Sequence, residues 1–199
     1  MVLVSSACGF AAEVVGQRPY EMEWAQRTID DHPPLVDFED LAGWRVEATN
    51  AEASWVCSRE QQIWGEHVGR LAYRATGGGE PDIRILPPRP IPIAQAFDAM
   101  TCWIYGNRWG YESDTTTPAV TISVLFEDQG GKEQEIVLFG IDWKEWHLCH
   151  RRLAPQQIAA VAGGVMLKGF RLVGGTNEDE RLLYFDNFAV FTEAFTPLT

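Results

Sequence analysis

The sequence predicts an all-β protein built as a two-sheet antiparallel sandwich. From residue 35 onward, short runs rich in β-branched and aromatic residues alternate with turn signals containing Gly, Pro or Asn, about every ten residues. No strand–helix–strand alternation and no internal repeat of fixed period accompany them. Of the 199 residues, 46% are hydrophobic, which is enough for a sizeable core. We therefore expect an N-terminal arm over residues 1–34 and one β-sandwich domain over residues 35–199.

Turn and breaker residues set the expected element boundaries. A short helix over residues 20–31 ends before Pro33, and a second over residues 155–162 ends at Gly163. Residues 87–92 hold four prolines and are predicted to be an extended crossover outside the sheets. The turn 129–131 joins two strands into a hairpin. In order, strands are expected at residues 35–40, 44–48, 53–58, 70–75, 82–86, 97–106, 120–128, 133–139, 146–150, 165–173 and 181–191.

The last strand carries one residue that breaks its apolar pattern. Asp186 puts a carboxylate where an unpaired charge would be costly. If this strand pairs with residues 35–40, Asp186 meets Asp37 and Glu39. Carboxylates that converge at the edge of a β-structure favour a hard cation, most often calcium. The alternative is an ion pair between Asp186 and an arginine.

Composition limits the classes of partner. A formal net charge of −12 and the lack of a basic cluster argue against nucleic acid. No apolar run is long enough to cross a membrane. The four cysteines are widely spaced, which argues against structural zinc and leaves disulfides open. The start, rich in small apolar residues, is interpreted as an arm or a truncated start rather than a complete signal peptide.

One aromatic segment is the best candidate for a binding site. It mixes flat rings with hydrogen-bonding side chains, as a sugar site requires. In a strand, Cys102 and Ile104 would face the core, which puts Trp103 and Tyr105 on the opposite face. For Trp103, a place in the core is an equal alternative. The predicted ligand-binding residues are Trp103, Tyr105, Asn107, Arg108, Trp109, Tyr111 and Glu112.

The sequence lacks the usual signatures of catalysis. It contains no GxSxG, no HExxH and no phosphate-binding glycine loop. His147, Cys149 and His150 lie close together, but strand alternation separates them onto two faces, so a transition-metal site is not favoured. The pairs Glu112 with Asp114 and Asp142 with Glu145 leave glycoside hydrolysis open as the alternative.

Together these patterns resemble the galactose-binding-like jelly-roll sandwich of many non-catalytic carbohydrate-binding modules. The resemblance spans about residues 35–193. It rests on five stretches: Val36–Glu39 with Gly43 and Trp44, then 99–106, 120–131, Trp143 with 146–148, and 183–188. The long lead-in and the loop 107–118 depart from it.

The resemblance implies a function and a metal site. It implies a structural Ca²⁺ held by Glu39 and Asp186, with Asp37 as a weaker third ligand and carbonyls near Gly69. It also implies binding of a polysaccharide or oligosaccharide in polysaccharide degradation, a secreted or periplasmic location, and neighbouring domains of a larger protein. The alternatives are a small glycoside hydrolase or polysaccharide lyase of the same fold, and a structural spacer.

Overall fold

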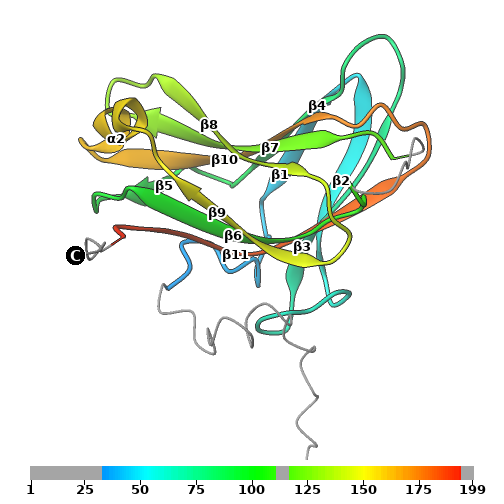
Figure 1. Ribbon diagram of the computed structural model, residues 1–199, viewed down its shortest axis with the longest axis horizontal. Helices are drawn as coiled ribbons and strands as arrows, with labels where there is room; N and C mark the ends of the chain where they lie inside the picture. Colours follow the sequence, from blue (N-terminus) through cyan, green and yellow to red (C-terminus); the bar gives the residue numbers. More distant parts are fainter. Residues whose placement is uncertain (1–32, 111–116, 194–199) are drawn as a thin grey trace, which may run out of the picture.

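Two antiparallel sheets pack face to face in the computed structural model, which describes residues 33–110 and 117–193. One sheet has the order β1-β4-β10-β7-β8, with β5 also paired to β10, and the other has the order β2-β3-β11-β6-β9 (Figure 1). The predicted sandwich is therefore confirmed. The strands are β1 (Arg45–Thr49), β2 (Ala51–Ser58), β3 (Val68–Ala75), β4 (Asp82–Leu86), β5 (Ile91–Ile93), β6 (Ala99–Tyr105), β7 (Val120–Asp128), β8 (Glu133–Ile141), β9 (Trp146–Arg152), β10 (Val165–Gly174) and β11 (Arg181–Phe191).

Residues 35–40 meet the last strand as predicted, but they do not form a strand. The amides of Leu35 and Val36 donate to the Phe188 carbonyl at 2.7 and 3.1 Å, and the Phe188 amide donates back to Val36. Pairing stops there, because Phe38 has a φ of 58° in the left-handed region, which an extended strand cannot contain. The predicted strand is thus reduced to a single bridge.

The proline-rich crossover also differs from its prediction. Ile91–Ile93 forms β5, which pairs with the start of β10 and places Pro92 opposite Met166. Among the described strands β10 is the one partner of β5, so β5 is an edge strand, the place in a sheet where proline is tolerated.

The two predicted helices have different outcomes. The second is present as α2 (Pro155–Val161), whereas residues 20–31 lie outside the described residues. Among the residues that the structure describes, no helix is long and apolar enough to cross a membrane.

Aromatic residues join the two sheets at the core. Phe38 is fully buried, and its ring lies 5.8–6.4 Å from four other rings. These rings come from both sheets, so the segment before β1 works as part of the core. The four partners of Phe38 are Trp44, Trp55, Phe170 and Phe185.

Three of the cysteines lie in the described residues, and all three are free thiols. Cys102 on β6 lies directly opposite Cys149 on β9, and both are fully buried. Burial raises the pKa of both thiols, so they stay protonated and behave as small apolar side chains.

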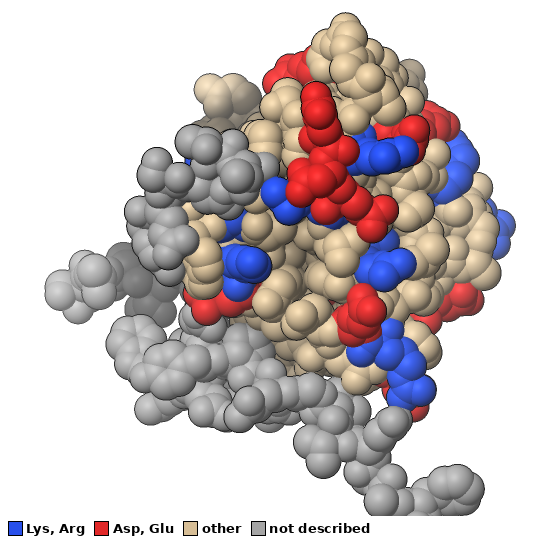
Figure 2. Space-filling model, turned by 90° about the vertical axis from the view of Figure 1, so that its right-hand side faces the viewer, with Lys and Arg blue, Asp and Glu red and all other residues tan. Residues whose placement is uncertain are grey.

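The outer face of the six-stranded sheet is covered by ion pairs. The Arg171 guanidinium bonds Asp82 at 2.8 Å and Glu135 at 2.6 Å. Arg84 bonds Glu133 at 2.7 Å, and Lys168 bonds Glu127 at 2.8 Å. The charged groups on this face therefore largely satisfy one another. Basic and acidic side chains also lie next to one another on the end of the molecule that Figure 2 shows.

Replacing Arg171 with methionine is expected to lower the stability of the fold above about pH 4 and to make that stability less dependent on pH in the acid range. The Arg171 hydrogen bonds hold the pKa of Asp82 below its usual range. A lowered folded-state pKa contributes stability that is present above the unfolded pKa of about 4 and is lost as the pH falls through the folded value. Urea midpoints measured between about pH 5 and pH 2 should therefore fall less steeply in the variant. Arg45→Met, which breaks an exposed pair with Glu47, is the control and should match wild type.

Candidate functional site

The outer face of the five-stranded sheet carries a second apolar cluster, separate from the core. We call it the aromatic face. It consists of buried Ile63, Val68, Trp103, Trp146 and Tyr184, with partly buried Trp64, Tyr105, Leu148 and Leu182 packed on them.

Strand register aligns part of this face into one row. Arg70 on β3 lies opposite Tyr184 on β11, which lies opposite Tyr105 on β6, which lies opposite Trp146 on β9. Directly opposed residues share a face of a sheet, so these four side chains point outward together. The Tyr105 ring meets Trp146 at 5.7 Å and Tyr184 at 5.9 Å, both edge-on.

Polar groups end the row. The Tyr184 hydroxyl donates to the Glu60 carboxylate at 3.0 Å, and Arg70 donates to the same oxygen at 3.4 Å. Burial and then the Glu60 hydrogen bond raise the pKa of Tyr184 to about 12, so its hydroxyl remains protonated at neutral pH. Tyr184 and Trp146 are buried, so the ring surface that the row offers beside the carboxylate and the guanidinium is that of partly exposed Tyr105.

A loop covers one end of the aromatic face. Ile63 and Trp64, on the chain between β2 and β3, pack with the Trp103 cluster. Trp103 points away from the core, as predicted, but its side chain is 2% exposed. Its ring therefore offers almost no surface to a ligand in this conformation, whereas Tyr105 and Trp64 remain partly exposed.

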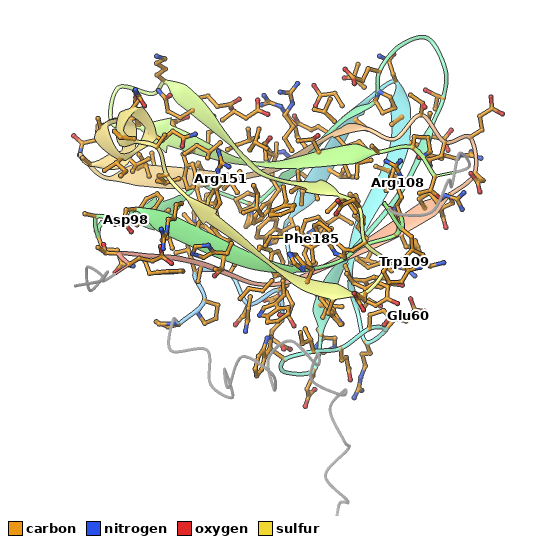
Figure 3. All side chains as sticks on the ribbon, viewed as in Figure 1. Glu60, Asp98, Arg108, Trp109, Arg151 and Phe185 are labelled. Atoms are coloured by element: carbon orange, nitrogen blue, oxygen red, sulfur yellow. The ribbon has the colours of Figure 1, made fainter. Side chains whose placement is uncertain are left out.

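Apart from Trp103 and Tyr105, the described residues among the predicted ligand-binding residues are not part of the aromatic face. The Asn107 amide donates to the Tyr73 hydroxyl at 3.0 Å, and Trp109 packs against the core between the sheets. Arg108 and Trp109 lie at one end of the sandwich, as does Glu60, far from Asp98 and Arg151 at the other end (Figure 3). Tyr111 and Glu112 lie outside the described residues.

Asp186 also lies on the outer side of the sheet, opposite Trp103, and is fully buried. One carboxylate oxygen accepts the Trp64 amide at 3.0 Å, whereas Oδ1 is buried without a hydrogen-bond partner. The pKa of Asp186 is raised to about 8, chiefly by burial; the backbone amides of Trp64 and Asn187 lower it, and the carboxylates of Glu39 and Asp37 add to the rise. Glu39 and Asp37 thus influence Asp186 electrostatically, and among the described residues no arginine forms an ion pair with it.

Glu39 binds the same loop as Asp186. Its carboxylate accepts the amides of Glu66 at 2.8 Å and His67 at 3.1 Å, and it lies 3.2 Å from the His67 ring nitrogen. Asp37 differs, because it is exposed and accepts the amide of Glu39 at 3.2 Å.

The carboxylates of Asp186 and Glu39 could hold a cation only if backbone carbonyl oxygens completed its coordination shell. Over residues 33–110 and 117–193, no group of three or more His, Cys, Asp or Glu side chains could hold a metal ion. Calcium takes six to eight oxygens, including backbone carbonyls. The unpaired Asp186 Oδ1 beside Glu39 supplies the anionic part of such a site, and loop carbonyls would have to supply the rest.

The groups considered for catalysis are dispersed. Asp142 and Glu145 are both exposed, and Glu112 and Asp114 lie outside the described residues. On β9, His147 packs on Trp143 at 4.7 Å, and His150 lies 2.6 Å from Glu193.

Several residues of the aromatic face were not among the predicted binding residues. Tyr184 and Asp186 are two apart on β11, so strand alternation alone places them on one face. That signal, combined with the predicted outward face of Trp103, could have identified Tyr184. Nothing in the sequence indicates that Glu60 and Arg70 meet it, because their contact depends on the register between β3 and β11. The residues missed are Trp64, Trp146 and Tyr184 of the aromatic face, together with Glu60 and Arg70 beside it.

The fold is similar to solved structures of carbohydrate-binding modules. No known family profile matches the sequence, and no curated protein sequence matches it. One similar structure is a module of the β-sandwich superfamily described as promiscuous in specificity, with 16% identity, 81% of this chain covered and a TM-score of 0.54. The chain spans 62% of that structure's length.

Two further structures extend the comparison. A family 11 carbohydrate-binding module from Clostridium thermocellum, solved with a β-1,3-1,4-linked tetrasaccharide, shares 12% identity over 81% of this chain and 95% of the module, with a TM-score of 0.50. A β-1,2-glucanase from Parabacteroides distasonis has the same identity and TM-score over 82% of this chain and 25% of the enzyme. At these identities the likeness shows the fold: this chain has the β-sandwich fold of carbohydrate-binding modules.

Proposed function

We propose that this chain is a non-catalytic carbohydrate-binding module, and that its ligand is a polysaccharide or oligosaccharide. The observation that carries the proposal is the cross-strand row of Arg70, Tyr184, Tyr105 and Trp146 on the aromatic face. Ring surface next to charged hydrogen-bonding groups is the chemistry that recognises a sugar. On the outer face of the other sheet, the described charged groups bond one another.

The structure modifies which residues we expect to bind the ligand. Tyr105 is at the centre of the row and partly exposed, so it is the expected stacking ring. Glu60 and Arg70, which already bond each other, would exchange part of that contact for sugar hydroxyls. Arg108 and Trp109, at the neighbouring end of the sandwich, remain predicted contacts. Tyr111 and Glu112, outside the described residues, also remain predicted contacts.

Replacing Tyr105 with alanine is expected to weaken glycan binding by about tenfold or more. Loss of one stacking ring removes on the order of 1–3 kcal/mol of contact energy. Affinity electrophoresis against a panel of plant and microbial polysaccharides, followed by calorimetry on the best ligand, measures the change. Trp109→Ala and Tyr111→Ala test the originally predicted segment in the same assay.

A matched control comes from the opposite sheet. Val137 is 46% exposed on β8, so Val137→Ala removes apolar surface away from the aromatic face and should leave affinity unchanged. If no glycan binds, or if Tyr105→Ala, Trp109→Ala and Tyr111→Ala all bind like wild type, the proposal fails. The chain would then be better explained as a structural spacer.

We also propose that Glu39 and Asp186 share a structural Ca²⁺, with Asp37 near the site. The support is the fully buried Asp186 carboxylate with one unpaired oxygen, next to a second carboxylate. Bound calcium would neutralise this concentration of negative charge and tie the residues before β1 to β11. A role in polysaccharide degradation, in a secreted or periplasmic enzyme with further domains, is part of the same proposal.

A further inference from the structure

A small hollow lies on the outer side of the five-stranded sheet, next to the row that carries the proposed function. It has a volume of about 180 Å³ and is lined mainly by residues of β2 and β3. Its floor is formed by Ser54 and Ala72, which lie directly opposite each other on these strands. Trp55, the neighbour of Ser54, packs toward the core, so strand alternation turns Ser54 outward. The hollow therefore exists because two short side chains meet on a surface of longer ones.

Strand register joins the hollow to the aromatic face. Ala72 lies opposite Leu182, which belongs to the aromatic face on β11. Two residues before Ala72 on β3, Arg70 begins the row that leads to Tyr105 on β6. Neighbouring strands lie about 4.8 Å apart, so β3 and β2 are roughly 10 and 14 Å from β6 in the order β2-β3-β11-β6. A single sugar ring stacked on Tyr105 is too short to reach the hollow, whereas a chain of sugars laid across the strands would enter it.

Charged side chains form the walls of the hollow. Arg74 donates to the Glu52 carboxylate at 2.9 and 2.6 Å, and Glu180 lines the same hollow. Beside the hollow, Arg70 donates to Glu60 at 3.4 Å. Each carboxylate–guanidinium pair places hydrogen-bond acceptors next to donors. A sugar hydroxyl both donates and accepts, so it can bond both members of such a pair, whereas an ionised carboxylate only accepts and an ammonium group only donates. The lining therefore matches uncharged sugar units that carry hydroxyls.

We propose that the ligand is an uncharged polysaccharide that runs across the strands from Tyr105 past Arg70, and that one of its sugar units fills the hollow over Ser54 and Ala72. This inference rests on the carbohydrate-binding function proposed above and adds one subsite to its site. Recognition then differs along the chain, because a ring stacks at one end and hydroxyls are bonded at the other. A uronate chain is disfavoured, because its carboxylates would meet the three carboxylates along this path.

Filling the hollow tests the added subsite. Ser54 is exposed on β2, so Ser54→Phe is expected to fold and to place a ring where the sugar unit would lie. Arg74→Met is the second variant, because it removes donors from the hollow without filling it. Thr121→Phe adds the same ring at an exposed position on β7 in the other sheet and is the matched control.

Binding to the full chain is measured for long and short forms of each glycan. The uncharged probes are mixed-linkage β-glucan, xylan and β-1,4-galactan with their disaccharides, and the charged probes are polygalacturonate and chitosan. Calorimetry measures the polysaccharides, and NMR titration measures the disaccharides. Ser54→Phe is expected to weaken binding of the best uncharged polysaccharide by about tenfold, the effect of losing one or two net hydrogen bonds, and to leave its disaccharide unchanged. Arg74→Met should act in the same direction, and Thr121→Phe should match wild type.

The outcomes separate this inference from the function on which it rests. Tyr105→Ala should weaken the polysaccharide and the disaccharide alike, because both stack on its ring. If Tyr105→Ala weakens the polysaccharide while Ser54→Phe and Arg74→Met bind it like wild type, the hollow is not a subsite and the carbohydrate-binding function stands. Tighter binding of polygalacturonate or chitosan than of every uncharged polysaccharide would overturn the substrate class. If none of these glycans binds, the function and the added subsite both fail.

Discussion

Replacing Phe38 with alanine is expected to lower the free energy of unfolding by about 3–5 kcal/mol, the usual cost of truncating a buried phenylalanine. Phe38 is fully buried and contacts rings from both sheets, so the cavity would form between the layers rather than at an edge. Equilibrium unfolding in urea measures the loss. We expect this to be among the most damaging single truncations outside the strands.

Two control variants test whether the lost stability comes from the lost apolar volume of Phe38. Phe38→Leu keeps most of the apolar volume and should cost clearly less than alanine. Val137→Ala, on an exposed position of β8, should change stability little. A Phe38→Ala protein that unfolds at the wild-type urea concentration would show that residues 33–40 contribute nothing to the core.

Chelation is expected to lower the melting temperature of the wild-type protein. Calcium that binds the folded state alone stabilises it by roughly 2.7 kcal/mol at a hundredfold excess over its dissociation constant. Asp186→Ala should remove the sensitivity to chelator, because it removes the fully buried carboxylate of the proposed site. Calorimetry with added calcium or chelator measures both effects.

The chelated protein should also show an unusual dependence on pH. Asp186 has a pKa of about 8 in the folded chain, against about 4 when unfolded. A raised acid pKa means that the folded state binds more protons, so stability falls as the pH rises from about 4 to about 8. Between pH 6 and pH 8 the loss would be up to roughly 2–3 kcal/mol. Asp186→Asn should lack this decline.

A wild-type melting curve that is the same with calcium and with chelator would contradict the calcium proposal. Magnesium is the control ion, because it demands a tighter octahedral shell and gives up its water reluctantly. Glu39→Gln should weaken calcium binding while keeping the volume of the side chain. Asp186→Ala removes a ligand and also truncates a buried side chain, so comparing the two variants separates the loss of a ligand from the loss of packing.

Much of the fold could be predicted because the local signals agree with one another. The strands Val120–Asp128 and Arg181–Phe191 occur with the predicted bounds, since each combines apolar β-formers with a clear turn before or after it. Residues 35–40 failed as a strand because Phe38 turns out of the extended region to reach the core. That choice is made by tertiary packing, and alternation along six residues cannot reveal it.

The candidate site could be predicted only in part, for a similar reason. The meeting of Asp186 with Glu39 follows from pairing the first and last segments. The outward face of Trp103 follows from alternation, but its burial involves Ile63 and Trp64 of the loop between β2 and β3, more than thirty residues away in sequence. The sequence predicts one site over residues 103–112, yet Tyr105 packs on the outer face of the sheet and Trp109 against the core, because the chain leaves β6 between them.

The position of the last strand has a consequence for how the chain is made. β11 lies in the middle of its sheet, between β3 and β6, and β10 lies in the middle of the other, between β4 and β7. A chain emerging from the ribosome therefore holds β1–β9 without the two strands that join them into sheets. Such non-local pairing is slow to form and leaves strand edges open meanwhile. Folding of the sandwich should thus be completed only after β10 and β11 have emerged, and the chain that still lacks them is the stage most exposed to aggregation.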